Sequence, residues 1–187
     1  MTNDHFTGFG QRQGSGRGRG QGMGRGSGRG RGQGGGRGFG GAGLSPDRRD
    51  QHEKDRHEFQ TLLARHDRLQ RNLECLPNGI RAVTTSDDPE LVPLIQHHVR
   101  RMHQRMLENW PVRRWDTLYI EIFKHRDEIE MEIRDLENGV WVEETSDNPR
   151  VAELLHAHGK TVNAFVEQGF NAARHPAPLP DGHTAEG

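Results

Sequence analysis

Four histidines are the residues whose type and spacing most clearly suggest chemistry. They are His66, His98, His125 and His158, each on the apolar side of a different segment with helical spacing. A buried imidazole loses hydration and needs partners for both ring nitrogens. Four of them facing one core are satisfied together by a metal ion, or by a haem whose iron takes two of them. The pattern therefore predicts a histidine-ligated metal or haem site.

Met102 extends this prediction, because it follows His98 by four residues and so projects from the same helix face. Thioether and imidazole ligands favour copper or haem iron over magnesium or calcium. The candidate ligands are His98, His125, His158 and Met102, with His66 as the least secure. The alternative interpretation is structural: each histidine is an ordinary core residue bonded to a backbone carbonyl or a carboxylate.

A second histidine group lies on other faces of the same predicted helices. It comprises His97, His103 and His156, together with Met106. The spacing is similar to the His-x-x-Met patterns of copper- and silver-binding polypeptides. However, Arg100, Arg101 and Arg105 are interleaved with it, and their charge discourages a cation. A solvated basic face paired with carboxylates from another helix is the alternative.

Several other chemistries lack their residues. A carboxylate-bridged diiron site in a bundle needs Glu-x-x-His pairs, whereas the positions three before the four histidines are Leu63, Ile95, Ile122 and Leu155. The single cysteine, Cys75, excludes an intrachain disulfide and multi-cysteine metal sites. No phosphate-binding loop is present, and no partner for a histidine acid or base stands out. Whether the chain catalyses a reaction is left open.

An internal duplication organises the segments that carry these side chains. Shifting the chain by 60 residues places Gly79–Pro89 on Gly139–Pro149 and His98 on His158. The shift places His66 on Arg126 rather than on His125, so the four histidines are not strictly equivalent. Matches spread over some thirty positions indicate a repeated structural unit.

Each unit is predicted to form a helix, a short strand and a second helix. The expected helices cover 59–76, 91–106, 115–136 and 151–169, and the expected strands cover 80–85 and 140–145. Pro77-Asn78-Gly79 is interpreted as a helix stop. The predicted fold class is mainly α (α+β): a pseudo-twofold helical bundle of four helices with two short strands.

The chain resembles a family of small, uncharacterised bacterial proteins. The residues that carry this resemblance are the repeated Gly-x-x-x-x-x-Thr-Ser-Asp-x-Pro start, Leu94–Val99, Trp115–His125 and the glycine–arginine leader. The resemblance spans most of the chain and supports the repeat and the domain boundaries. It implies no activity.

The first 44 residues differ sharply in composition from the rest. They hold 19 of the 25 glycines and a net charge of +6, whereas residues 45–187 have a net charge of −7. Such a segment buries too little apolar surface to fold alone. It resembles the arginine–glycine segments of RNA-associated proteins, which predicts contacts with nucleic acid through its arginines. The candidates are Arg17, Arg19, Arg25, Arg29, Arg31 and Arg37. The alternative is a flexible leader.

The predicted domain organisation has three parts. Residues 1–44 form a disordered tail, 45–174 form one domain of two repeats (about 50–109 and 112–172), and 175–187 form a flexible C-terminal tail. No apolar run is long enough for a membrane span, and no secretory signal is present, so we expect a cytoplasmic protein without membrane contacts.

Two functions follow from these patterns. The first is a small protein that binds copper or haem through histidine and methionine, for storage, sensing or electron transfer. The second is a nucleic-acid-associated protein that binds RNA or DNA through its tail. In the second, the histidine-rich domain provides protein contacts or a homo-oligomer.

Overall fold

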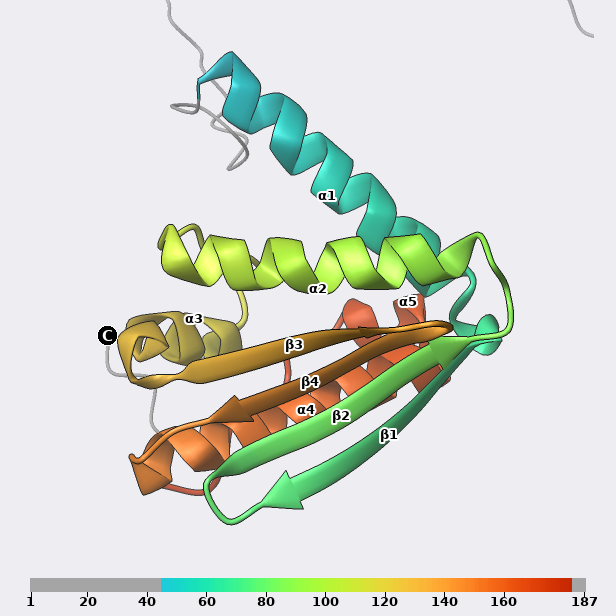
Figure 1. Cartoon of the computed structure of the whole chain (residues 1–187). Helices are drawn as coiled ribbons and strands as arrows, with labels where there is room; N and C mark the ends of the chain where they lie inside the picture. Colours follow the sequence, from blue (N-terminus) through green and yellow to red (C-terminus); the bar gives the residue numbers. More distant parts are fainter. Residues whose placement is uncertain (1–44, 183–187) are drawn as a thin grey trace, which may run out of the picture. The chain divides into compact units, whose positions relative to one another are not determined.

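The structure, a computed structural model, describes residues 45–182 (Figure 1). These residues belong to one structural unit. Each half of this part contains a helix, a short 3-10 turn, a β-hairpin and a second helix. The first half comprises α1 (Pro46–Ala64), a turn (His66–Arg68), β1 (Leu69–Leu76), β2 (Gly79–Ser86) and α2 (Leu91–Leu107). The second comprises α3 (Thr117–Lys124), a turn (Arg126–Glu128), β3 (Glu130–Leu136), β4 (Gly139–Thr145), α4 (Pro149–Gln168) and α5 (Phe170–Ala173).

The four strands form one antiparallel sheet in the order β1-β2-β4-β3. Its central pair, β2 and β4, joins the two halves, with Gly79 opposite Thr145 and Thr85 opposite Gly139. A Cβ atom on Gly79 would lie 2.0 Å from the carbonyl oxygen of Glu144, and one on Gly139 would lie 2.0 Å from that of Thr84. The close approach of the two central strands therefore requires glycine at both positions, which accounts for the glycine in the repeated motif.

The rest of the repeated motif forms hydrogen bonds at the strand ends and at the starts of the following helices. The Ser86 amide donates to the Asn138 carbonyl, and the Ser146 amide donates to the Asn78 carbonyl. Each serine hydroxyl then accepts a bond from the amide two residues later, that of Asp88 or Asn148. The motif thus joins strand ends to helix starts in the same way in both halves.

Helices α2 and α4 pack on the same face of the sheet, each over the hairpin of the other half. Helix α2 contacts β2, β3 and β4, while α4 contacts β1 and β2. Figure 1 shows α4 behind the sheet, and α1 on the outer side of α2, which it crosses obliquely with its N-terminal end pointing away. On α4, a Cβ on Gly159 would lie 2.8 Å from a methyl carbon of Leu73, so this glycine lets α4 lie close to β1.

The core lies between this face and the helices. Its buried residues form two groups. One contains Leu63, Leu118, Tyr119, Ile122, Leu154 and Phe165; the other contains Leu62, Leu91, Ile95, Val140 and Val142. The opposite face of the sheet is polar: Arg81 pairs with Glu74 and Glu143, and Trp141 packs under Arg134. This alternation along the strands separates a buried face from a solvated one.

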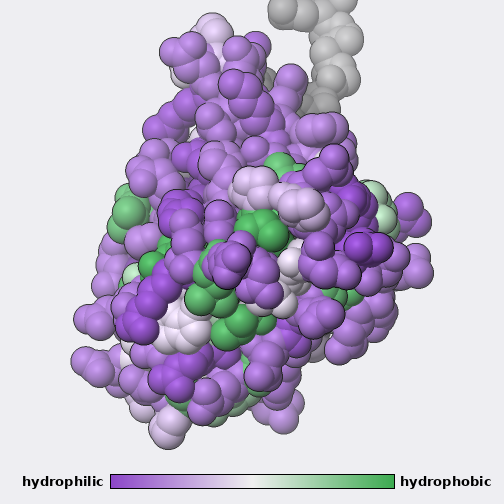
Figure 2. Space-filling view, turned by 45° about the vertical axis from the view of Figure 1, so that its right-hand side comes forward, coloured by the Kyte–Doolittle hydropathy of each residue, from purple (hydrophilic) through white to green (hydrophobic). Residues whose placement is uncertain are grey.

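Hydrophilic residues dominate the side of the molecule in Figure 2, where a hydrophobic group is exposed near the centre and smaller hydrophobic spots lie toward the edges. None of the helices between residues 45 and 182 is both long enough and apolar enough to cross a bilayer.

The predicted four-helix core with two short strands is wrong. The described part has a four-stranded sheet, and segments 69–76 and 130–136, predicted as the ends of long helices, are strands β1 and β3. Leu69, Leu73 and Leu76 fit a helical spacing, but Leu69, Arg71 and Leu73 also alternate with exposed residues as in a strand. Pro77-Asn78 is a two-residue hairpin connection rather than a helix stop. The helical-bundle description fails with it.

Candidate ligand-binding site

A half-open pocket of about 100 Å³ lies between the sheet and three helices. Most of its lining is apolar: Phe59, Leu62, Leu63, Leu69, Ile95, Val99, Val162, Phe165 and Val166. Three polar side chains complete the lining, those of Arg71, Thr84 and His98. The antiparallel pairing of β1 and β2 places Arg71 directly opposite Thr84, and both face the helices. Strand alternation therefore brings a guanidinium into an otherwise apolar interior.

Arg71 is held only by neutral groups. Its Nε donates to the side-chain oxygen of Asn163 at 3.0 Å, and Nη1 donates to the Thr84 hydroxyl at 2.8 Å. Between residues 45 and 182, no carboxylate oxygen forms an ion pair with it. Burial lowers the pKa of Arg71, and the charge of Glu144 partly opposes this change. Arg71 is half-buried, and an anion that reaches its guanidinium gains a charge-assisted hydrogen-bond partner.

His98 contributes an unpartnered nitrogen to the same cavity. Its ring stacks on Phe59 with centroids 5.4 Å apart, and its buried Nδ1 has no hydrogen-bond partner among the described residues. Burial lowers the pKa of His98 to about 4, so the ring is neutral at pH 7. A neutral imidazole has one N–H donor and one acceptor nitrogen, and the bonding capacity of the buried Nδ1 is unused among the described residues.

The predicted ligand histidines have different surroundings. His66 Nδ1 lies 2.9 Å from the Val166 carbonyl oxygen, and His125 Nδ1 lies 2.6 Å from a Glu128 carboxylate oxygen. His158 packs edge-on against Tyr119 at 5.6 Å. Its Nδ1 is buried without a partner, and burial lowers its pKa. Each of these histidines thus has its own surroundings, as the structural interpretation describes. Met102 lies half-buried on α2.

No three histidine, cysteine, aspartate or glutamate side chains in the described part of the chain are grouped as metal ligands. The predicted metal-binding group is therefore wrong for residues 45–182. The physical reason is the fold: the strands replace the C-terminal parts of two predicted helices, so the four histidines do not share one bundle core. Binding of copper or haem through fewer ligands is untested and stays a prediction.

Two members of the second histidine group, His156 and His97, contact other elements of the fold. His156 Nε2 lies 2.8 Å from the Leu76 carbonyl oxygen, while the equivalent Gln96 donates to the carbonyls of Leu136 and Gly139. Each contact ties a helix to the turn of the hairpin beneath it. His97 Nδ1 lies 2.7 Å from a Glu58 carboxylate oxygen.

A buried ion cluster attaches α1, which forms one wall of the cavity, to α2. Asp55, 4% exposed, accepts bonds from Arg105, 1% exposed, at 2.6 and 2.9 Å, and from Arg101 and Gln51. The Arg105 guanidinium also stacks on Trp110 at 3.9 Å. Burial alone raises the pKa of Asp55, but the hydrogen bonds from Gln51, Arg101 and Arg105 hold it below its usual value. The cluster fixes the helix that covers the cavity.

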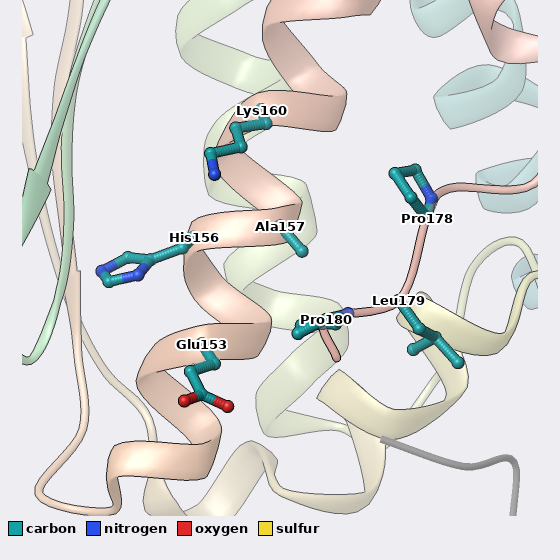
Figure 3. Close-up of a pocket in the computed structure, with 7 residues that line it drawn as sticks. All are labelled: Glu153, His156, Ala157, Lys160, Pro178, Leu179 and Pro180. Carbon is teal, nitrogen blue, oxygen red and sulfur yellow. The ribbon is translucent and has the colours of Figure 1, made fainter. Parts of the chain in front are cut away.

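A larger hollow of about 320 Å³ lies at the surface between α4 and residues 178–180 (Figure 3). In Figure 3, Ala157 projects toward the proline-containing segment, whereas the His156 ring extends the other way. That ring is already bonded to Leu76. This hollow is larger, but the pocket beside Arg71 brings a guanidinium, a hydroxyl and an imidazole together. We take that half-open pocket as the candidate site.

The sequence predictions missed Arg71 and Thr84. The sequence signal for Arg71 is its position two residues from Leu69 and from Leu73, which puts all three side chains on one face only if the segment is a strand. The tail arginines proposed for nucleic acid, from Arg17 to Arg37, lie outside the described residues.

Comparison with protein-family models, curated proteins and solved structures finds no match for this chain. The resemblance to a bacterial family therefore stays a prediction, and the site itself is the basis for a function.

Proposed function

We propose that the protein binds a small anion in this half-open pocket, with Arg71 as the charged anchor. One observation carries this proposal: among the described residues, the guanidinium of Arg71 is bonded only to neutral oxygens at the wall of the pocket. An anion there compensates the charge and forms charge-assisted hydrogen bonds. The neutral ring of His98 supplies a second polar contact.

Such a site suits sensing or storage of a ligand. Helix α1 provides Phe59, Leu62 and Leu63 to the pocket wall. A bound ligand therefore adds contacts to this helix. A ligand that binds only the folded state stabilises it by mass action. The proposal keeps the cytoplasmic location that the sequence predicts.

The test is a titration of the full chain with acetate, nitrate and phosphate, followed by calorimetry and by the unfolding temperature. At least one anion is expected to bind saturably and to raise the unfolding temperature. Arg71→Met should abolish this binding. Arg81→Met is the matched control, because Arg81 lies on the neighbouring strand but pairs with Glu74 and Glu143 on the solvated face. Unchanged binding in Arg71→Met contradicts the proposal, as does the absence of saturable binding.

The composition of residues 1–44, seven arginines and one acid, supports nucleic-acid binding as a second proposal. Counterion release makes such binding fall steeply with salt. Replacing six arginines (17, 19, 25, 29, 31 and 37) by glutamine should remove the affinity of the full chain for single-stranded RNA. Retained affinity in that variant contradicts this second proposal.

A further inference from the structure

The hydrogen bonds of Arg71 leave one edge of its guanidinium for a ligand. Nε is occupied by Asn163, and Nη1 gives one of its two protons to Thr84. Among the described residues, Nη2 has no hydrogen-bond partner. Nη2 therefore retains both of its protons for a ligand, and Nη1 retains one. Two parallel N–H donors match the two oxygens of a carboxylate.

The rest of the cavity suits an alkyl group. Val99 of α2 and Val162 and Val166 of α4 line it together with two phenylalanine rings. Apart from Arg71, its polar lining consists of the Thr84 hydroxyl, already bonded to Arg71, and the His98 ring. A tetrahedral inorganic anion has four oxygens that need donors, and an apolar wall leaves several of them unsatisfied. A carboxylate carries its oxygens at one end and an apolar group at the other.

The volume measures the part of a ligand that this half-open pocket covers. A cavity of about 150 Å³ accepts the six carbons of benzene. By proportion, the 100 Å³ here covers roughly four or five non-hydrogen atoms. Acetate and propionate have that size, whereas the end of a six-carbon acid would extend beyond the pocket.

From this arrangement, and resting on the anion-binding function proposed above, we infer that the ligand is a short-chain monocarboxylate of two or three carbons. Its carboxylate meets the free edge of Arg71 and the His98 ring. Its methyl or ethyl group contacts Val99, Val162 and Val166.

The test compares ligands matched in size or charge on the full chain by calorimetry. Acetate and propionate are expected to bind. Propionamide, a neutral isostere of propionate, is expected to bind at least about tenfold more weakly, and hexanoate, whose extra carbons extend past the pocket, no more tightly than propionate. Nitrate and phosphate should also bind at least about tenfold more weakly than propionate. Val162→Leu, which adds one methylene to the cavity wall, should weaken propionate more than acetate, with circular dichroism showing an intact fold.

The outcomes separate the two proposals. Nitrate or phosphate binding as tightly as the carboxylates overturns the carboxylate inference but leaves an anion site at Arg71. Affinity that rises from propionate to hexanoate overturns the size limit. Propionamide binding as well as propionate, or no binding by any of these ligands, overturns both this inference and the proposed function.

Discussion

The two hairpins have the same backbone arrangement but different chemistry at one inward-facing pair. In the first hairpin Arg71 is opposite Thr84; 60 residues later, Met131 is opposite Glu144. One half therefore places a cation under the helices and the other a carboxylate, whose side chain is 12% exposed. The two charges influence one another, but no ion pair joins them in the described part. The comparison shows that the two halves repeat one backbone arrangement but differ in charge at a single inward-facing pair.

The first prediction concerns what the two halves share. Gly79→Ala and Gly139→Ala should each destabilise the protein by more than about 4 kcal/mol, because each new Cβ meets a backbone carbonyl that cannot move aside. The two effects should be alike. Urea unfolding measures them. Gly182→Ala is the comparison, because a Cβ there has no neighbour within 4 Å and only the positive φ of 82° opposes it, which costs about 1–2 kcal/mol. A mild effect at one glycine and a severe one at the other contradicts the equivalence of the halves.

The second prediction concerns equivalent positions with different roles. Asp55→Asn should cost about 3 kcal/mol of stability, because it leaves the buried Arg105 without its anionic partner. The equivalent residue, Trp115, is 57% exposed, and Trp115→Ala should cost about 1 kcal/mol or less. Equal losses in denaturant unfolding argue against a specific role for the Asp55 cluster.

The third prediction uses the pKa of His98, which burial lowers from 6.5 to about 4. Below pH 6.5 the unfolded chain takes up a proton at His98 while the folded chain does not, so stability is lost as pH falls from 6.5 to 4. The loss approaches about 3 kcal/mol. Unfolding free energies at pH 7, 5.5 and 4.5 measure it, and His98→Leu should flatten the profile. The same slope in wild type and His98→Leu contradicts the assignment.

The fourth prediction concerns the loss of the charge of Arg71. Arg71→Met should raise the unfolding free energy of the ligand-free protein by about 1 kcal/mol, since it replaces a charge held by neutral oxygens with the side chain type of the other half. Thermal and urea unfolding both report it. A clear loss of stability indicates that Arg71 is a structural residue.

The smallest expected effect concerns the carboxylate of the second half. Glu144 lies near enough to act on the pKa of Arg71, so its charge competes with an added anion. Glu144→Gln should tighten acetate binding roughly threefold. Calorimetry with wild type and variant decides this, and weaker binding in Glu144→Gln assigns Glu144 a different role.

Local sequence patterns identify part of this fold. The strands predicted over 80–85 and 140–145 lie within β2 and β4, and His98 lies on a buried side of α2, as the helical spacing predicts. The outer strands were missed, because spacing compatible with a helix concealed the alternation of Leu69, Arg71 and Leu73. Nor does local spacing show that Asn163, 92 residues away, bonds to Arg71. The candidate site depends on which helix covers which hairpin, and that is decided by long-range packing.

The most direct measurement of the central claim is an isotope-filtered nuclear Overhauser experiment on the full chain with ¹³C-labelled propionate. An occupied cavity predicts contacts from the propionate methyl to the methyl groups of Val99 and Val162, together with a shift of the Arg71 Nε–H signal on titration. Contacts only to exposed residues, or an unchanged Arg71 signal at saturating propionate, would contradict the account.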